Sequence, residues 1–136
     1  MATYPQPSKQ AAAYAYQQFE LVTFTVAAKV GNAINVAVVL KDSRGNKPLG
    51  RVYCSAYLAS AAAGVPITPT NPTSATAIGT NGSIIGQDTS NAMFSIVTDT
   101  QGRFDINITQ PAGGTNYYLV IRLPNGAIVV SPVIAF

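Results

Sequence analysis

The sequence predicts an all-β protein, an antiparallel two-sheet β-sandwich over residues 19–136, with an extended N-terminal arm over residues 1–18. Two observations lead to this prediction. From Phe19 onward, apolar and polar residues alternate with a period of two, which places alternate side chains on opposite faces of a strand. Seven to nine such runs are separated by regularly spaced turn residues, as in two-sheet sandwiches. The length of 136 residues fits one domain.

The arm is predicted because residues 1–18 show no apolar period of either kind. They carry one charged side chain, Lys9, and three tyrosines, Tyr4, Tyr14 and Tyr16. Tyrosine is enriched at interfaces because it buries a large apolar area and keeps a hydroxyl for a partner. We therefore expect these tyrosines, together with Phe19 at the end of the arm, to contact another chain. An extended arm of this length reaches roughly 60 Å.

Three strands are expected in the first half of the sandwich. In each of them the residues on one side are apolar and face the core. These residues are Val22, Phe24, Val26 and Ala28 in the first strand, Ile34, Val36, Val38 and Leu40 in the second, and Val52, Cys54, Ala56 and Leu58 in the third. Gly31 and Asn32 separate the first two strands, and residues 41–46 contain the Asp and Gly of a tight turn. Tyr53, Ser55 and Tyr57 then face away from the core.

A long Pro-rich loop is expected from Ala59 to Thr76, where prolines recur at every third position. Proline removes a backbone donor and favours an extended conformation, which discourages a central strand. Two short strands are expected after the loop, near residues 77–78 and 83–85.

The C-terminal third predicts two hairpins and an edge strand. Residues 93–98 and 103–109 flank the turn 99–102, and residues 117–123 and 127–130 flank the turn 124–126. Residues 131–136 follow, with Pro132 marking an edge. We expect one core to contain Phe24, Val38, Phe94, Ile96, Phe104 and Ile106.

Composition indicates an assembly component and not an enzyme. Charged residues make up 10% of the chain, against about 25% in an average domain, and a neutral surface promotes association. The chain has no histidine, which excludes the usual Ser-His, Cys-His and His-metal machinery. Cys54 is the single cysteine and is expected to be a small core residue. We therefore expect no catalytic residue, cofactor or metal.

Two acidic residues near the turn 99–102 have alternative interpretations. Asp99 and Asp105 could form a carboxylate pair or half of a calcium site. The simpler interpretation is structural: Asp99 accepts hydrogen bonds in its turn, and Asp105 faces solvent because it alternates with Phe104 and Ile106. Asp42 is expected to act as Asp99 does.

The densest charge in the chain is basic and lies on Lys41, Arg44, Lys47 and Arg51. This segment is expected either to be a solvated hairpin tip or to bind an acidic partner. Nucleic acid is disfavoured because the pI is only about 9.2 and no aromatic residue is interleaved with the charges. No apolar run is long enough for a membrane span, and no secretion signal is recognisable, so synthesis and folding in a cytoplasm are expected.

Several segments, taken in order, resemble small immunoglobulin-like proteins that are encoded in the head-gene region of tailed bacteriophages and look like capsid decoration or cement proteins. The segments are residues 31–45, 52–58, 98–102, 118–120, 124–126 and Ser131. The resemblance implies an immunoglobulin-like sandwich, and a jelly-roll-like one stays open. It implies no catalytic residue, the major capsid protein as partner, homo-oligomeric clusters on the capsid, and a location on the exterior of the virion.

The sequence leaves alternatives to capsid decoration. A tail, fibre or surface adhesion module that recognises a host carbohydrate is one, since Asn71, Asn81, Asn91 and Asn116 fall in expected loops. A minor enzyme is another, although the sequence offers no cluster of ionisable groups.

Overall fold

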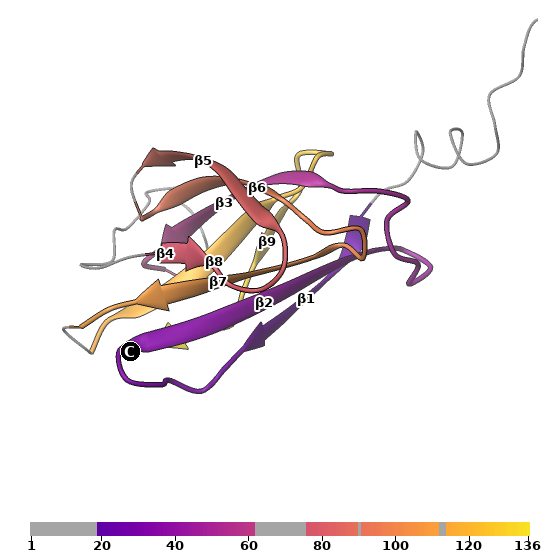
Figure 1. Ribbon diagram of the computed structural model, residues 1–136. Helices are drawn as coiled ribbons and strands as arrows, with labels where there is room; N and C mark the ends of the chain where they lie inside the picture. The colour runs from indigo at the N-terminus through magenta and orange to yellow at the C-terminus, as the bar shows by residue number, and fades with distance from the viewer. Residues whose placement is uncertain (1–18, 62–75, 90, 112–113) are drawn as a thin grey trace, which may run out of the picture.

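The computed structural model describes residues 19–61, 76–89, 91–111 and 114–136, which form ten β-strands and no helix (Figure 1). The strands make two antiparallel sheets that pack face to face, as predicted. The arm residues Tyr4, Tyr14 and Tyr16 and most of the Pro-rich loop lie outside the described residues.

The first sheet has four strands in the order β1-β2-β7-β4. These are β1 (Phe19–Val26), β2 (Ala33–Asp42), β7 (Arg103–Thr109) and β4 (Thr76–Ile78). The second sheet has six strands in the order β10-β8-β3-β6-β5, and β9 pairs with β8 beside β10. These are β10 (Ile134–Ala135), β8 (Asn116–Arg122), β3 (Tyr53–Ala59), β6 (Met93–Val97), β5 (Ser83–Thr89) and β9 (Ile128–Val130). In Figure 1 the β1–β2 pair lies below β5 and β6.

This strand order corresponds to the immunoglobulin arrangement, in which strands A, B, E and D face strands C, F and G. Strands β1, β2, β7 and β4 take the positions of A, B, E and D, and β3, β8 and β9–β10 take those of C, F and G. The pair β5–β6 comes between the D-like and E-like strands in the chain. It extends the second sheet by two strands beyond β3, which widens the outer face of that sheet.

The inward-facing apolar residues of both sheets form one core, as the alternation along each strand predicts. Val38, Phe94, Ile96, Phe104 and Ile106 are at most 1% exposed, and Phe24 packs against them from β1. Cys54 is buried in the same core. One residue departs from the pattern: Ala28 is exposed, because β1 ends at Val26 and the chain turns toward β2.

The turn at residues 99–102 does not close a hairpin, which corrects the sequence prediction. Its chemistry is that of a tight turn, because Asp99 Oδ1 accepts hydrogen bonds from the backbone amides of Gln101 and Arg103. The strands then separate: β6 pairs with β3 and β5, whereas β7 pairs with β2 and β4. Phe94 and Phe104 consequently enter the same core from opposite sheets.

The basic segment is likewise not a hairpin tip, since β2 and β3 belong to different sheets and residues 43–52 cross between them. The expected turn is present. Asp42 Oδ1 accepts hydrogen bonds from the amides of Arg44 and Asn46, and Gly45 has a φ of 81°, which favours glycine. The hairpin of β8 and β9 and the edge position of β10 are as predicted.

Asp105 does not face solvent, contrary to the prediction from its alternation with Phe104 and Ile106. It points away from the core, but it is only 5% exposed. Residues 79–81, which follow β4, fold over it. The carboxylate accepts hydrogen bonds from the amides of Thr80 and Asn81 and from Asn35 Nδ2. Burial alone would raise the pKa of Asp105, yet the hydrogen bonds from Asn35, Asn81 and Thr80 lower it overall, so the carboxylate stays ionised.

Gly79 is what allows this crossing to lie on the carboxylate. A Cβ at this position would collide with Asp105 and crowd Asn35 Nδ2. The backbone of the two residues is also bonded, because the Gly79 amide donates to the Asp105 carbonyl at 2.8 Å. The charged acceptor therefore fixes the segment that carries the chain from β4 in the first sheet to β5 in the second.

Gly79→Ala should destabilise the protein by about 1–3 kcal/mol, because the collision breaks hydrogen bonds to a buried charged group. Gly86→Ala is the matched control, since a Cβ there meets open space. The free energy of unfolding, measured by urea denaturation, should fall for the Gly79 variant and stay within about 0.5 kcal/mol for the control. Equal stability of the two variants would contradict the proposed role of Asp105.

Phe104→Ala should lower the free energy of unfolding by about 3–5 kcal/mol, the usual cost of truncating a buried aromatic residue. Thr25→Ala, at an exposed position of β1, serves as the control. A loss below about 1 kcal/mol for the Phe104 variant in the same urea titration would show that the cavity collapses without cost.

Candidate interaction surface

The four basic residues that the sequence singled out are exposed and lie at the end of β2 and on the connection from β2 to β3. Lys41 is near the end of β2, Arg44 is in the turn, and Lys47 and Arg51 follow it. Pro48, between them, is buried and holds the connection against the domain. The structure thus presents the four side chains at one end of the sandwich, where an acidic partner could reach them.

Phe19 is not available to a partner, which corrects its assignment to the contact residues of the arm. It is the first residue of β1, is 8% exposed and belongs to the core. The cause is a β-bulge: between Phe19 and Leu21 the strand has one residue more than β2 opposite. A shift of one residue moves a side chain to the other face of a strand. Phe19 therefore points inward although Val22 and Phe24 lie at the other parity.

The outer face of the six-stranded sheet carries a second group of apolar side chains. Of the large apolar residues, the sequence predicts only Tyr53 and Tyr57 on this face. Tyr57, Ala59 and Val120 are buried there and pack with Met93 and Val130. They lie on the face of β3, β8, β6 and β9 that is turned away from the core. Sandwich sheets often expose a polar outer face, so this apolar cluster needs another explanation.

The register of the strands creates a depression beside this cluster. Ser55 on β3 lies directly between Ser95 on β6 and Arg122 on β8, and Gly86 on β5 lies next to Ser95. Three neighbouring strands thus carry small residues in one row across the sheet. The next outward-facing row on one side of these small residues contains the larger side chains of Tyr57 and Met93, which are paired across β3 and β6. Tall side chains beside a row of small ones leave a hollow.

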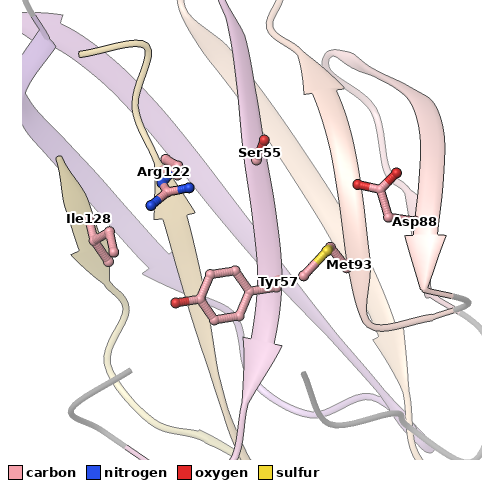
Figure 2. Close-up of a pocket in the computed structure, with 6 residues that line it drawn as sticks. All are labelled: Ser55, Tyr57, Asp88, Met93, Arg122 and Ile128. Atoms are coloured by element: carbon pink, nitrogen blue, oxygen red, sulfur yellow. The ribbon is translucent and has the colours of Figure 1, made fainter. Parts of the chain in front are cut away.

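The hollow is a pocket of about 150 Å³ lined from five strands (Figure 2). Its lining residues are Ser55 and Tyr57 of β3, Asp88 of β5, Met93 of β6, Arg122 of β8 and Ile128 of β9. In Figure 2 the Tyr57 ring extends from β3 toward β8, and Asp88 lies to the other side of β3, on β5. Sites for free small molecules usually measure roughly 300–1,000 Å³. This pocket is smaller and matches one side chain or one ring.

Opposite charges flank the pocket, and its floor is uncharged. Arg122 stands on the β8 side and Asp88 on the β5 side. Burial raises the pKa of the Tyr57 phenol, and the positive charge of Arg122 offsets part of that effect. Tyr57 therefore stays a neutral phenol at physiological pH. Ile128 is 39% exposed and Tyr53, two residues from Ser55 on β3, is 52% exposed. Apolar and aromatic surface thus continues outward from the pocket.

Catalytic chemistry gains no support from the arrangement of the described side chains. Burial raises the pKa of the Cys54 thiol to about 12, so the nucleophilic thiolate does not form near neutral pH. Within residues 19–61, 76–89, 91–111 and 114–136, no group of three His, Cys, Asp or Glu side chains could hold a metal ion. In the same part of the chain, no helix is long and apolar enough to cross a bilayer.

The pocket could not be predicted from the sequence, because its six lining residues come from five strands whose order in the sheet differs from their order in the chain. Alternation along β3 places Ser55 and Tyr57 outside the core, but nothing in the sequence pairs Ser55 with Arg122. No protein-family model matches this chain, and no curated protein matches it significantly.

Proposed function

We propose that this protein is a structural component of a tailed-bacteriophage virion, a decoration or cement protein that binds the capsid exterior and stabilises contacts between major capsid subunits. The observation that carries the proposal is a partly apolar, tyrosine-bearing pocket on the outer face of a wide sheet, in a chain with only 10% charged residues. Tyrosine, methionine and arginine are enriched in protein interfaces, and the pocket holds all three. The sequence resemblance to head-gene products supplies the capsid as partner.

The mechanism we infer is adhesive. A β-sandwich provides a rigid footprint, and each copy contacts the major capsid protein without chemical change. On a lattice, copies that also cluster with one another gain effective concentration, so modest contacts sum to high avidity. Expansion or breakage of the shell must then break many contacts together.

A second candidate is a tail, fibre or surface module that recognises a host carbohydrate. The pocket favours it in one respect, because Asp88, Arg122 and Ser55 place an acceptor, a donor and a hydroxyl around the Tyr57 ring. Those groups suit the hydroxyls and the apolar face of one sugar ring. Host binding, however, needs few copies per particle, whereas decoration needs many.

Copy number separates the two candidates. Quantitative mass spectrometry of purified virions should find the protein in the same order of abundance as the major capsid protein. Labelled protein should decorate heads in negative-stain images. A few copies per particle, with label confined to the tail, would contradict decoration and support the adhesion module.

Capsid binding should tolerate salt, because the sandwich carries a net charge of only +2 once Lys9 is set aside. At about 0.5 M salt the Debye length is about 4–5 Å, which screens exposed charges and leaves apolar contacts intact. We expect the dissociation constant for empty capsids to change less than about tenfold between low salt and 0.5 M.

The same titration tests the basic segment. The double variant Arg44→Ala, Lys47→Ala should bind nearly as well as the unmodified chain, with Thr25→Ala as an uncharged control. A roughly hundredfold weakening in salt, reproduced by the double variant and not by the control, would show that Lys41, Arg44, Lys47 and Arg51 clamp an acidic capsid patch.

A further inference from the structure

We propose that the pocket on the six-stranded sheet receives one tyrosine side chain from residues 1–18 of a second copy of this chain, so that neighbouring copies are joined by exchanged arms. This inference goes beyond the capsid role and does not depend on it, since the exchange needs only two copies of the protein.

The size and chemistry of the pocket select the side chain. A cavity of about 150 Å³ is large enough to hold a benzene ring, and the pocket has that volume. Met93 and Tyr57 offer the sulfur and aromatic contacts that a ring prefers. Asp88, at the margin, can accept a hydrogen bond from a phenol hydroxyl. Tyrosine is the side chain that uses both the apolar floor and the carboxylate.

The chain itself contains the matching tyrosines. Four of its seven tyrosines belong to the sandwich; of these, Tyr57 and Tyr117 are buried and the Tyr53 hydroxyl is hydrogen-bonded to Ser95 at 3.1 Å. The other three lie within residues 1–18, in a segment whose only charged side chain is Lys9. The pocket is flanked by one positive and one negative side chain, so a segment with a single charge meets no net electrostatic repulsion there. The positive charge of Lys9 is attracted to the carboxylate of Asp88.

Reach favours the pocket of a second copy over that of the same copy. Phe19 is held in the core at the start of β1, in the four-stranded sheet, whereas the pocket opens on the outer face of the other sheet. Tyr16 and Tyr14 precede Phe19 by three and five residues, which span at most about 10 and 18 Å. The sheets alone are about 10 Å apart, and the chain would also have to pass around a sheet edge. These two tyrosines are therefore better placed to enter a neighbour.

Each copy thus offers one donor segment and one receptor pocket on different sheets. Two copies can exchange segments reciprocally in a closed dimer, or successive copies can close a ring. Both outcomes produce the homo-oligomeric clusters expected of a protein that decorates a lattice.

Disulfide trapping tests the contact with full-length protein. One variant carries Ala15→Cys, between Tyr14 and Tyr16, and the other carries Gly86→Cys, in the row of small residues where a side chain meets open space. Cys54 is buried and does not compete. On mixing under mild oxidation, the two variants should form a disulfide-linked heterodimer. Thr25→Cys, exposed on the four-stranded sheet, replaces Gly86→Cys in the control and should give little product.

Equal yields with Gly86→Cys and Thr25→Cys would overturn the proposal, as would the absence of any heterodimer. The doubly substituted chain, Ala15→Cys with Gly86→Cys, tests the alternative occupant. If it forms only an intramolecular bridge at every protein concentration, the arm docks on its own domain and the exchange is refuted.

Light scattering supplies a second readout without new thiols. The double variant Tyr14→Ala, Tyr16→Ala should self-associate at least about tenfold more weakly than the unmodified chain, as expected for loss of an interface anchor. Its unfolding midpoint is measured at a protein concentration too low for association, so that a loss of fold stability is distinguished from a loss of contact between copies. Tyr4→Ala is the matched control. Self-association that is equal in all three proteins, or absent from the unmodified chain, would refute the exchange.

Discussion

Packing of two apolar sheet faces against each other is the constraint on which the rest of this structure depends. Phe94 and Ile96 from one sheet share a core with Phe104 and Ile106 from the other, and all four are almost completely buried. Because side chains alternate along a strand, committing these residues to the core also commits their neighbours to the outside. In the same way, Ser55 and Tyr57 face outward because Cys54, Ala56 and Leu58 are in the core, and Arg122 faces outward between the core residues Ile121 and Leu123. The pocket is therefore a consequence of core packing, because the residues that line it occupy the opposite face of the strands that form the core.

The two outer faces then acquire different characters. On the four-stranded sheet, the ionised Asp105 is covered by residues 79–81 and bonded to Asn35, so its polar groups are satisfied within the domain. On the six-stranded sheet, Tyr57 and Met93 gather apolar surface around a hollow, and Ile128 remains partly exposed. A face whose polar groups are satisfied internally has little to offer a partner, whereas an apolar hollow gains by being filled. This asymmetry supports docking through the wider sheet.

The insertion of β5 and β6 between the D-like and E-like strands links fold to surface. Without it the sheet would end at β3, and neither Met93 nor Asp88 would stand beside Ser55. Asp105 contributes to this extension from the other sheet, because it anchors the residues that lead from β4 to β5. The Asp105 carboxylate of the four-stranded sheet thereby helps to position β5, the strand that carries Asp88 at the margin of the pocket on the six-stranded sheet.

The amino-acid sequence by itself determined which residues form strands and which of them turn inward. Alternation identified Ile34, Val36 and Val38 as core residues. An Asp three residues before a Gly, and the Asn-Gly pair at 125–126, located the turns, because both effects act over a few neighbouring residues. Tertiary structure alone decided which strands pair. The turn at 99–102 looks local, yet it joins two sheets; a bulge buries Phe19; and a distant crossing buries Asp105. The pocket belongs to this second class, since strand partners are chosen by the packing of the whole core and leave no trace in the spacing of Ser55, Asp88 and Arg122.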